Sequence, residues 1–359
     1  MGPLHPLLAP PPQLALNPLS STSAHLLSFL FTSGYVGSIY ISNHLASSGD
    51  APKRKAAVSA SSTGGTEENS TSLPLPPISA EDAPDDAFLD PSAPQPGDRN
   101  HPATIRSRMK AVGLATALSL GGVWYTVKTI GGYGAVEAVR PTLSLLGLPL
   151  PSFPSLSALP ITVLPYVLAP ALLLGPLYAT YLDGDLPSFS YTRREGLQIQ
   201  WDRFSGPESG WGLAEWRNYV VGPLTEELVF RSCLLSVALL SRTSMRSMTF
   251  ATPLWFGVAH AHHAWETYTK GGRTSSAAVR AVAGSLFQLT YTTLFGWFAT
   301  YSYLRTASVL PALASHAYCN VMGIYLPNVA AQRHPGRKGL IWGMYGLGIA
   351  GFVVGLRRL

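Results

Sequence analysis

The chain is a succession of apolar stretches that are long enough to cross a lipid bilayer, and this pattern constrains the fold more than any other feature. A crossing helix needs about 20 apolar residues, and its backbone groups must be satisfied within the segment. Only 12% of the 359 residues are charged, against about 25% in ordinary soluble proteins. The sequence therefore predicts an all-α, polytopic membrane helical bundle with about eight transmembrane helices. The predicted spans are approximately 26–41, 111–130, 159–181, 218–240, 248–264, 279–304, 307–326 and 340–356.

Composition separates the N-terminal part of the chain from the remaining spans. Residues 1–24 are Pro-rich and contain no Lys or Arg, unlike a cleaved signal peptide, so the first transmembrane helix, 25–42, is expected to be retained. Residues 43–110 are rich in Ser, Pro, Ala, Asp and Glu. Such a segment buries too little apolar surface to order itself, and it is predicted to be a disordered loop. Residues 111–359 would form the membrane-embedded core.

Basic residues are unevenly distributed between the two sides of the predicted bundle. Of the 25 Lys and Arg residues, 17 fall in loops after odd-numbered spans and 7 on the opposite side, while Arg231 lies within a span. Because cytosolic loops carry an excess of Lys and Arg, the first set of loops is predicted to be cytosolic and both ends of the chain lumenal or external. The net charge of +6 is interpreted in the same way, and nucleic acid is not expected as a partner.

Two adjacent carboxylates, Glu226 and Glu227, lie inside the predicted span 218–240. An ionisable group near the middle of a bilayer costs on the order of 3 kcal/mol, so such a pair indicates a functional site. Adjacent helical residues diverge by about 100°, and the two carboxylates are therefore expected to have different roles. Arg231 follows Glu227 at i+4, a spacing that suits an ion pair. A purely structural ion-pair cluster is the alternative for these three residues.

Two histidines and an asparagine are predicted to share the depth of the carboxylates. His260 lies in span 248–264, and His316 and Asn320 lie on one face of span 307–326, at i and i+4. Counted from the ends of their spans, Glu226, His260 and His316 are roughly 9 to 17 Å from the cytosolic side of a ~30 Å core. The sequence thus predicts one intramembrane catalytic cavity. Either histidine alone could instead be a satisfied core residue.

This set of groups suits the hydrolysis of an amide. A carboxylate can act as the base for water, an imidazole can share or position the proton, and two hydrogen-bond donors can stabilise a developing oxyanion. The two cysteines, Cys233 and Cys319, both lie in apolar segments. They are expected to be small, reduced core residues rather than nucleophiles, since no activating base is evident beside either thiol.

The segment Pro223–Arg231, together with the preceding run Arg217–Val221, resembles the Glu-Glu-x-x-x-Arg motif of a known family. That family is the type II CAAX prenyl endopeptidases, the Ras-converting enzymes of the CPBP/ABI group of intramembrane glutamate proteases. A lone motif of this kind would be weak evidence.

Two further motifs make the resemblance specific. Phe256 and His260 are similar to the family's Phe-x-x-x-His, and His316 and Asn320 are similar to its His-x-x-x-Asn/Asp. The three motifs occur in the family's order on three separate spans. The resemblance covers roughly residues 190–330.

The resemblance implies roles for individual residues. By analogy, Glu226 is the general base for the attacking water, helped by His260, and Glu227 orients the site. His316 and Asn320 would form the oxyanion hole. The supporting residues would be Arg231 and Phe256.

The resemblance also implies an activity and a place in the cell. The chain would remove the last three residues from prenylated CAAX proteins, farnesylated or geranylgeranylated, such as Ras-type small GTPases. It would be a multi-pass protein of the endoplasmic reticulum membrane, in contact with lipid, with its active site open to the cytosol. Residues 111–359 would then be the protease core, with the motifs within 217–326.

Two other functions remain open from the residues alone. No cofactor is expected for the glutamate mechanism, but Glu226, His260 and His316 could bind zinc with water as a fourth ligand. The chain lacks the His-Glu-x-x-His spacing of one common zinc protease class. A proton-coupled transporter with a buried Glu/His relay is the alternative from another class, although no internal repeat of the kind common in transporters is evident.

Overall fold

A computed structural model of the chain describes residues 4–61, 100–148, 163–184, 212–259 and 262–359. This described part consists of helices joined by turns and contains no strand. The fold class predicted from the apolar stretches is therefore confirmed: the protein is an all-α bundle.

The helices fall into three groups along the chain. The N-terminal group is η1 (Pro6–Leu8), α1 (Pro12–Leu16), α2 (Ser21–Ser61), α3 (Pro102–Gly131) and α4 (Val139–Leu145). The middle group is α5 (Leu164–Leu172), α6 (Leu174–Asp183), α8 (Leu213–Glu215), η4 (Trp216–Val221), α9 (Gly222–Glu227), η5 (Leu228–Cys233) and α10 (Leu234–Leu240). The C-terminal group is α11 (Met245–Ala259), α12 (His262–Lys270), α13 (Ser275–Thr306), α14 (Leu310–Met322), α15 (Pro327–Arg333), η6 (Pro335–Arg337) and α16 (Lys338–Arg358). η1 and η6 are 3₁₀ turns, whereas η4 and η5 are π-helical.

The prediction of a disordered loop over residues 43–110 is wrong at both ends of that segment, where the structure has helices. Helix α2 continues to Ser61, where Ala, Lys and Arg favour a helix despite the polar composition. Helix α3 begins at Pro102, and a proline at the first helical position has its fixed φ already set for a helix. The rest of the predicted loop, 62–99, lies outside the described residues.

The third predicted span, 159–181, is broken near a proline. Its described part forms α5 and α6, which meet at an angle of 58°. Pro176 has no N–H, so the carbonyl of Leu172 loses its partner four residues on, and the helix breaks between the two segments.

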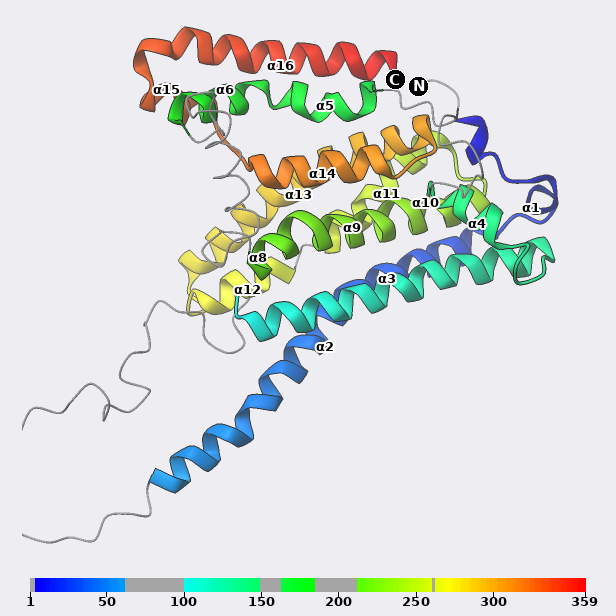
Figure 1. Cartoon of the computed structure of the whole chain (residues 1–359), viewed down its shortest axis with the longest axis horizontal. Helices are drawn as coiled ribbons and strands as arrows, with labels where there is room; N and C mark the ends of the chain where they lie inside the picture. Colours follow the sequence, from blue (N-terminus) through cyan, green and yellow to red (C-terminus); the bar gives the residue numbers. More distant parts are fainter. Residues whose placement is uncertain (1–3, 62–99, 149–162, 185–211, 260–261) are drawn as a thin grey trace, which may run out of the picture.

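The helices run side by side in a broad bundle (Figure 1). Helix α16 lies along α5 and α6 at one side, α2 and α3 pair at the other, and α9, α11, α13 and α14 lie between them. Gly348 permits the close approach of α16, because a Cβ there would lie 2.7 Å from the carbonyl oxygen of Ala171. The second half of α2 extends away from the bundle.

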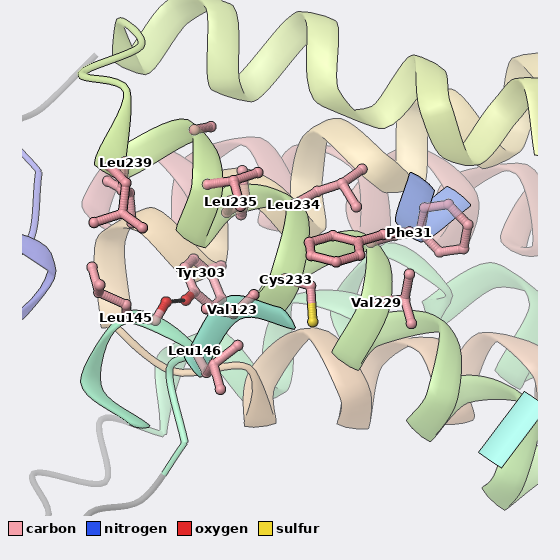
Figure 2. Close-up of a cluster of buried hydrophobic side chains, with 14 of the residues drawn as sticks. Phe31, Val123, Leu145, Leu146, Val229, Cys233, Leu234, Leu235, Leu239 and Tyr303 are labelled. Atoms are coloured by element: carbon pink, nitrogen blue, oxygen red, sulfur yellow. Dashed lines mark hydrogen bonds between the residues drawn. The ribbon is translucent and has the colours of Figure 1, made fainter. Parts of the chain in front are cut away.

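The main core fills the space between α2, α3, α4, α10 and α13. Figure 2 shows Phe31, Val123, Leu235 and Tyr303 converging there from four of these helices. The hydroxyl of Tyr303 donates to the carbonyl of Leu145, which satisfies the one polar atom of that ring. This core holds the N-terminal part of the chain against the helices that carry the motifs.

The outer faces of the bundle are apolar, as a lipid-facing surface requires. Exposed side chains on three long helices include Leu114, Leu118, Val282, Leu286, Leu347 and Val354. By length and hydropathy, two described helices could cross a membrane alone, over Ser21–Ser42 and Pro335–Arg358, and a third if α5 and α6 form one bent span. The other described helices fall short in length or in mean hydropathy, so the count of eight stays a prediction.

Candidate active site

The glutamate pair lies on a helix that is continuous from α8 to α10 and contains two π-helical segments. Glu226 and Glu227 end the α-helical segment α9, which is flanked by the π-helical segments η4 and η5. Single π-helical turns inside α-helices occur frequently at functional sites. Thus the carboxylates are set in an irregular part of an otherwise regular span.

His316, on α14, contacts both carboxylates with opposite sides of its ring. Its Nδ1 lies 2.7 Å from Oε1 of Glu227, a hydrogen-bond distance. Its Nε2 lies 3.6 Å from Oε2 of Glu226. The two glutamates diverge around their helix as predicted, yet they share one imidazole. Their environments differ, since the Glu226 side chain is 25% exposed and that of Glu227 is 1% exposed.

Arg231 compensates the charge of the buried glutamate. Its Nε lies 3.2 Å from Oε2 of Glu227, in an ion pair that is not aligned as a hydrogen bond. The guanidinium is sandwiched by aromatic rings, 4.6 Å from the centroid of Phe256 and 5.5 Å from that of Phe295. Cation–π contacts of this kind stabilise a desolvated cation. The predicted pairing of Arg231 with Glu227 is present, and Phe256 contacts the same arginine.

A cavity of about 1680 Å³ opens beside these residues. Glu226, His316 and Asn320 all line it, whereas Glu227 does not. Apolar and aromatic side chains form much of the remaining wall, among them Phe230, Phe256, Phe295, Phe298, Leu294 and Ile349. The cavity can therefore hold a substrate that is partly polar and partly hydrophobic.

Tyr35 is a cavity residue that the sequence motifs did not indicate. It lies on α2, is buried, and its hydroxyl is 2.9 Å from the hydroxyl of Thr225, next to Glu226. Its ring packs edge-on against Phe230 at 5.6 Å. The sequence did contain one signal for this residue, a tyrosine inside an apolar span. A buried tyrosine hydroxyl usually has a polar partner, so such a tyrosine indicates a polar group nearby.

Asn320 joins α14 to the start of the glutamate helix. Its Nδ2 donates to the backbone carbonyl of Asn218 at 2.9 Å, which engages one of its two amide hydrogens. Asn320 and His316 share a face of α14, as their spacing predicted, and both line the cavity.

His260, predicted to assist the base, lies outside the described residues. Of the three residues predicted to share one depth, Glu226 and His316 lie side by side in the structure. Among the residues that the structure describes, no group of three His, Cys, Asp or Glu side chains is placed to hold a metal ion. Both cysteines are free thiols; Cys233 is buried and Cys319 is half-buried in the cavity wall.

Comparison with known proteins places this site in a family. A family model described as type II CAAX prenyl endopeptidase Rce1-like matches residues 210–322. A human protein named CAAX prenyl protease 2 is 34% identical over 262 residues, which is 73% of each chain. The chain belongs to the type II CAAX prenyl endopeptidase family.

Relatives in other kingdoms carry the same name. An Arabidopsis thaliana CAAX prenyl protease 2 is 34% identical over 171 residues, covering 48% of this chain and 51% of that protein. A probable CAAX prenyl protease 2 of Schizosaccharomyces pombe is 39% identical over 109 residues, covering 30% and 39%. No solved structure matches the chain. The endopeptidase family model spans Glu226, Glu227, His316 and Asn320, but it does not reach Tyr35.

Proposed function

We propose that this protein is an endopeptidase that removes the last three residues of prenylated CAAX proteins by a glutamate-activated water. One observation carries the mechanism: His316 lies between a cavity-facing carboxylate, Glu226, and a buried one, Glu227. The human, plant and yeast relatives named as CAAX prenyl proteases support the substrate class.

Glu226 is the general base in this mechanism. Its carboxylate lines the cavity and can hold a water molecule, take its proton as the hydroxide attacks the scissile carbonyl, and return that proton to the leaving amine. Glu227 has a different task, because Arg231 pairs with it and it faces away from the cavity. It fixes the ring of His316 through Nδ1.

His316 and Asn320 would stabilise the tetrahedral intermediate. With Nδ1 held by Glu227, the Nε2 of His316 points towards Glu226 and the reacting centre. A protonated Nε2 and the second amide hydrogen of Asn320 can each donate to the oxyanion. His260 would assist Glu226, as the family motif implies.

The peptide part of the substrate would enter the cavity from the cytosol, and its prenyl chain would enter from the bilayer. The apolar cavity wall suits a farnesyl or geranylgeranyl chain, and the polar residues suit the peptide. We infer Ras-type small GTPases as one substrate group and the endoplasmic reticulum membrane as the location, with the active site open to the cytosol.

A zinc-dependent mechanism is the second candidate. The carboxylate of Glu226 and the Nε2 of His316 converge within 3.6 Å at the cavity wall, and carboxylate and imidazole are common ligands of catalytic zinc. Activity lost to a chelator and restored by zinc would favour this candidate.

The proposal is tested by cleavage of a farnesylated CAAX peptide by purified protein in detergent or liposomes. Glu226→Gln keeps the shape but removes the base, and we expect activity to fall by about 10²- to 10⁴-fold. Glu215→Gln makes the same change about three turns earlier on this helix, outside the cavity wall, and should keep wild-type activity. Full activity in Glu226→Gln would refute the mechanism.

A further inference from the structure

The C-terminal helix α16 forms part of the wall of the catalytic cavity. This helix carries none of the sequence motifs and lies outside residues 210–322, which the family model matches. The apolar cavity residues of α16 stand at i, i+3, i+4 and i+7, which places them on one face of the helix: Ile349, Phe352, Val353 and Leu356. The same cavity is lined by Glu226. The last helix of the chain is therefore exposed to whatever occupies the active site.

A different face of α16 packs against α5. Gly348 and Gly355 are seven residues apart, and a Cβ on either would lie 2.7 Å or less from an atom of α5. Ile349 and Val353 are not covered by this contact and remain exposed. Since their side chains border both the cavity and the outer surface of the bundle, the cavity opens sideways along α16.

A row of aromatic rings leads from His316 to this opening. The ring centroid of Phe295 lies 5.1 Å from that of His316, and the centroid of Phe298 lies 6.2 Å from that of Phe295. Phe352 of α16 continues the row, edge-on to Phe298 at 5.3 Å. All four rings line the cavity. They give it an apolar surface that runs from the proposed reacting centre on α14, along α13, to α16.

The prenyl chain of the proposed substrate begins next to the bond that is cut. Removal of the last three residues breaks the peptide bond that follows the prenylated cysteine, so the chain starts one side chain away from the reacting carbonyl. With that carbonyl beside Glu226 and His316, the nearest ring of the row is Phe295. An apolar chain that leaves this point is favoured by contact with apolar surface.

We propose that α13 and α16 together hold the prenyl chain, with its first isoprene units on Phe295 and Phe298 and its far end on Phe352 and Val353. The inference rests on the proposed function, since it names the part of the substrate that this side of the cavity binds. It gives α16 a substrate-binding role that none of the three motifs indicates.

The test compares two peptides of one sequence, one farnesylated and one geranylated, whose chains differ by one isoprene unit. The measured quantity is the KM of the geranylated peptide divided by the KM of the farnesylated peptide. Val353→Trp fills the far end of the proposed site with a larger ring. We expect this variant to lower the KM ratio about 10-fold relative to the wild type, because the last isoprene unit loses its contacts with α16. A fold defect would lower kcat for both peptides and leave the KM ratio unchanged.

Val354→Trp is the matched control. The two valines are neighbours on α16 and are 41% and 51% exposed, but only Val353 lines the cavity. Val354→Trp should keep the wild-type KM ratio. Both variants are assayed in the same detergent, so partitioning of the peptides into micelles cancels between them. If Val353→Trp does not fold, Ile349→Trp makes the same test one turn earlier, with Leu347→Trp as its control outside the cavity wall.

An unchanged KM ratio in Val353→Trp would overturn the prenyl site, and the opening along α16 would then face bilayer lipid alone. An equal fall in Val353→Trp and Val354→Trp would overturn it too, because the effect would not come from the cavity face. Failure of the wild-type protein to cleave either peptide would instead refute the proposed function.

Discussion

Tyr35 connects the first long helix to Thr225, the residue next to the proposed base Glu226. The hydroxyl of Thr225 donates to the carbonyl of Val221 at 2.8 Å, so the Tyr35 hydroxyl must donate to Thr225. Removing it leaves the α9 backbone less firmly held beside Glu226. We therefore expect this contact to act mainly on the position of the proposed base.

We therefore expect Tyr35→Phe to lower kcat about three- to tenfold with little change in KM, because one hydrogen bond contributes about 1 kcal/mol. Steady-state cleavage of the farnesylated peptide measures both constants. Tyr125→Phe, at an exposed position of α3, is the control and should have no effect. A change confined to KM would mean that Tyr35 contacts the substrate instead.

Some site contacts follow from spacing along one helix and others do not. The i+4 interval of Glu227 and Arg231 predicted their ion pair, and it is present at 3.2 Å. The double contact of His316 joins residues 89 and 90 positions apart, and helical periodicity carries no information about which ring nitrogen meets which carboxylate. Tyr35 was missed for the same reason.

At the scale of helices, a closely packed glycine of α13, Gly296, lies at the crossing with α11. A Cβ on Gly296 would lie 2.6 Å from Cβ of Pro253 and 3.4 Å from Nη2 of Arg231. The proline ring cannot turn aside as a flexible side chain would. Close packing at this crossing keeps the arginine in its aromatic sandwich.

Gly296→Ala should consequently destabilise the protein by about 1–3 kcal/mol and reduce activity. Gly284→Ala, on the same helix with open space around the new Cβ, should instead stabilise by about 0.4–1 kcal/mol. Thermal unfolding in detergent measures both. If Gly296→Ala raises the melting temperature as Gly284→Ala does, the crossing is looser than described.

The sequence predicted where helices lie better than where they begin, end or break. Apolar runs located α3, α13 and α16 to within about ten residues. They did not reveal that α2 continues to Ser61, since a polar helix has no apolar face to detect. The short helix α15 in the last loop was also unpredicted; it lies against α6 and α16 through tertiary packing.

At the scale of the whole molecule, both ends of the described chain contact the same end of α13. The N–H of His5 donates to the carbonyl of Leu304 at 3.1 Å, and Nε of Arg305 donates to the carbonyl of Leu359 at 2.8 Å. Figure 1 shows the N and C labels close together. An even number of membrane crossings satisfies this arrangement.

We expect acceptor sites for N-glycosylation appended to either end to be modified in the endoplasmic reticulum, because both ends are predicted to be lumenal. The chain supplies an internal control in Asn69-Ser70-Thr71, which lies in a loop predicted to be cytosolic and should stay unmodified. Gel mobility with and without a glycosidase measures the outcome. Modification at one end alone would contradict an even number of crossings.

His5 and Leu359 contact the neighbouring residues Leu304 and Arg305 of α13, so the two ends of the described chain lie close together. This arrangement would allow the protein to be circularly permuted. A short flexible linker could join the two ends of the described chain without crossing the membrane, and the backbone would then be circular. New ends could be opened between α2 and α3, which would separate the helix bearing Tyr35 from its sequence neighbour but leave their packing unchanged. Circular permutation would thus alter the order in which the helices enter the membrane while preserving the site.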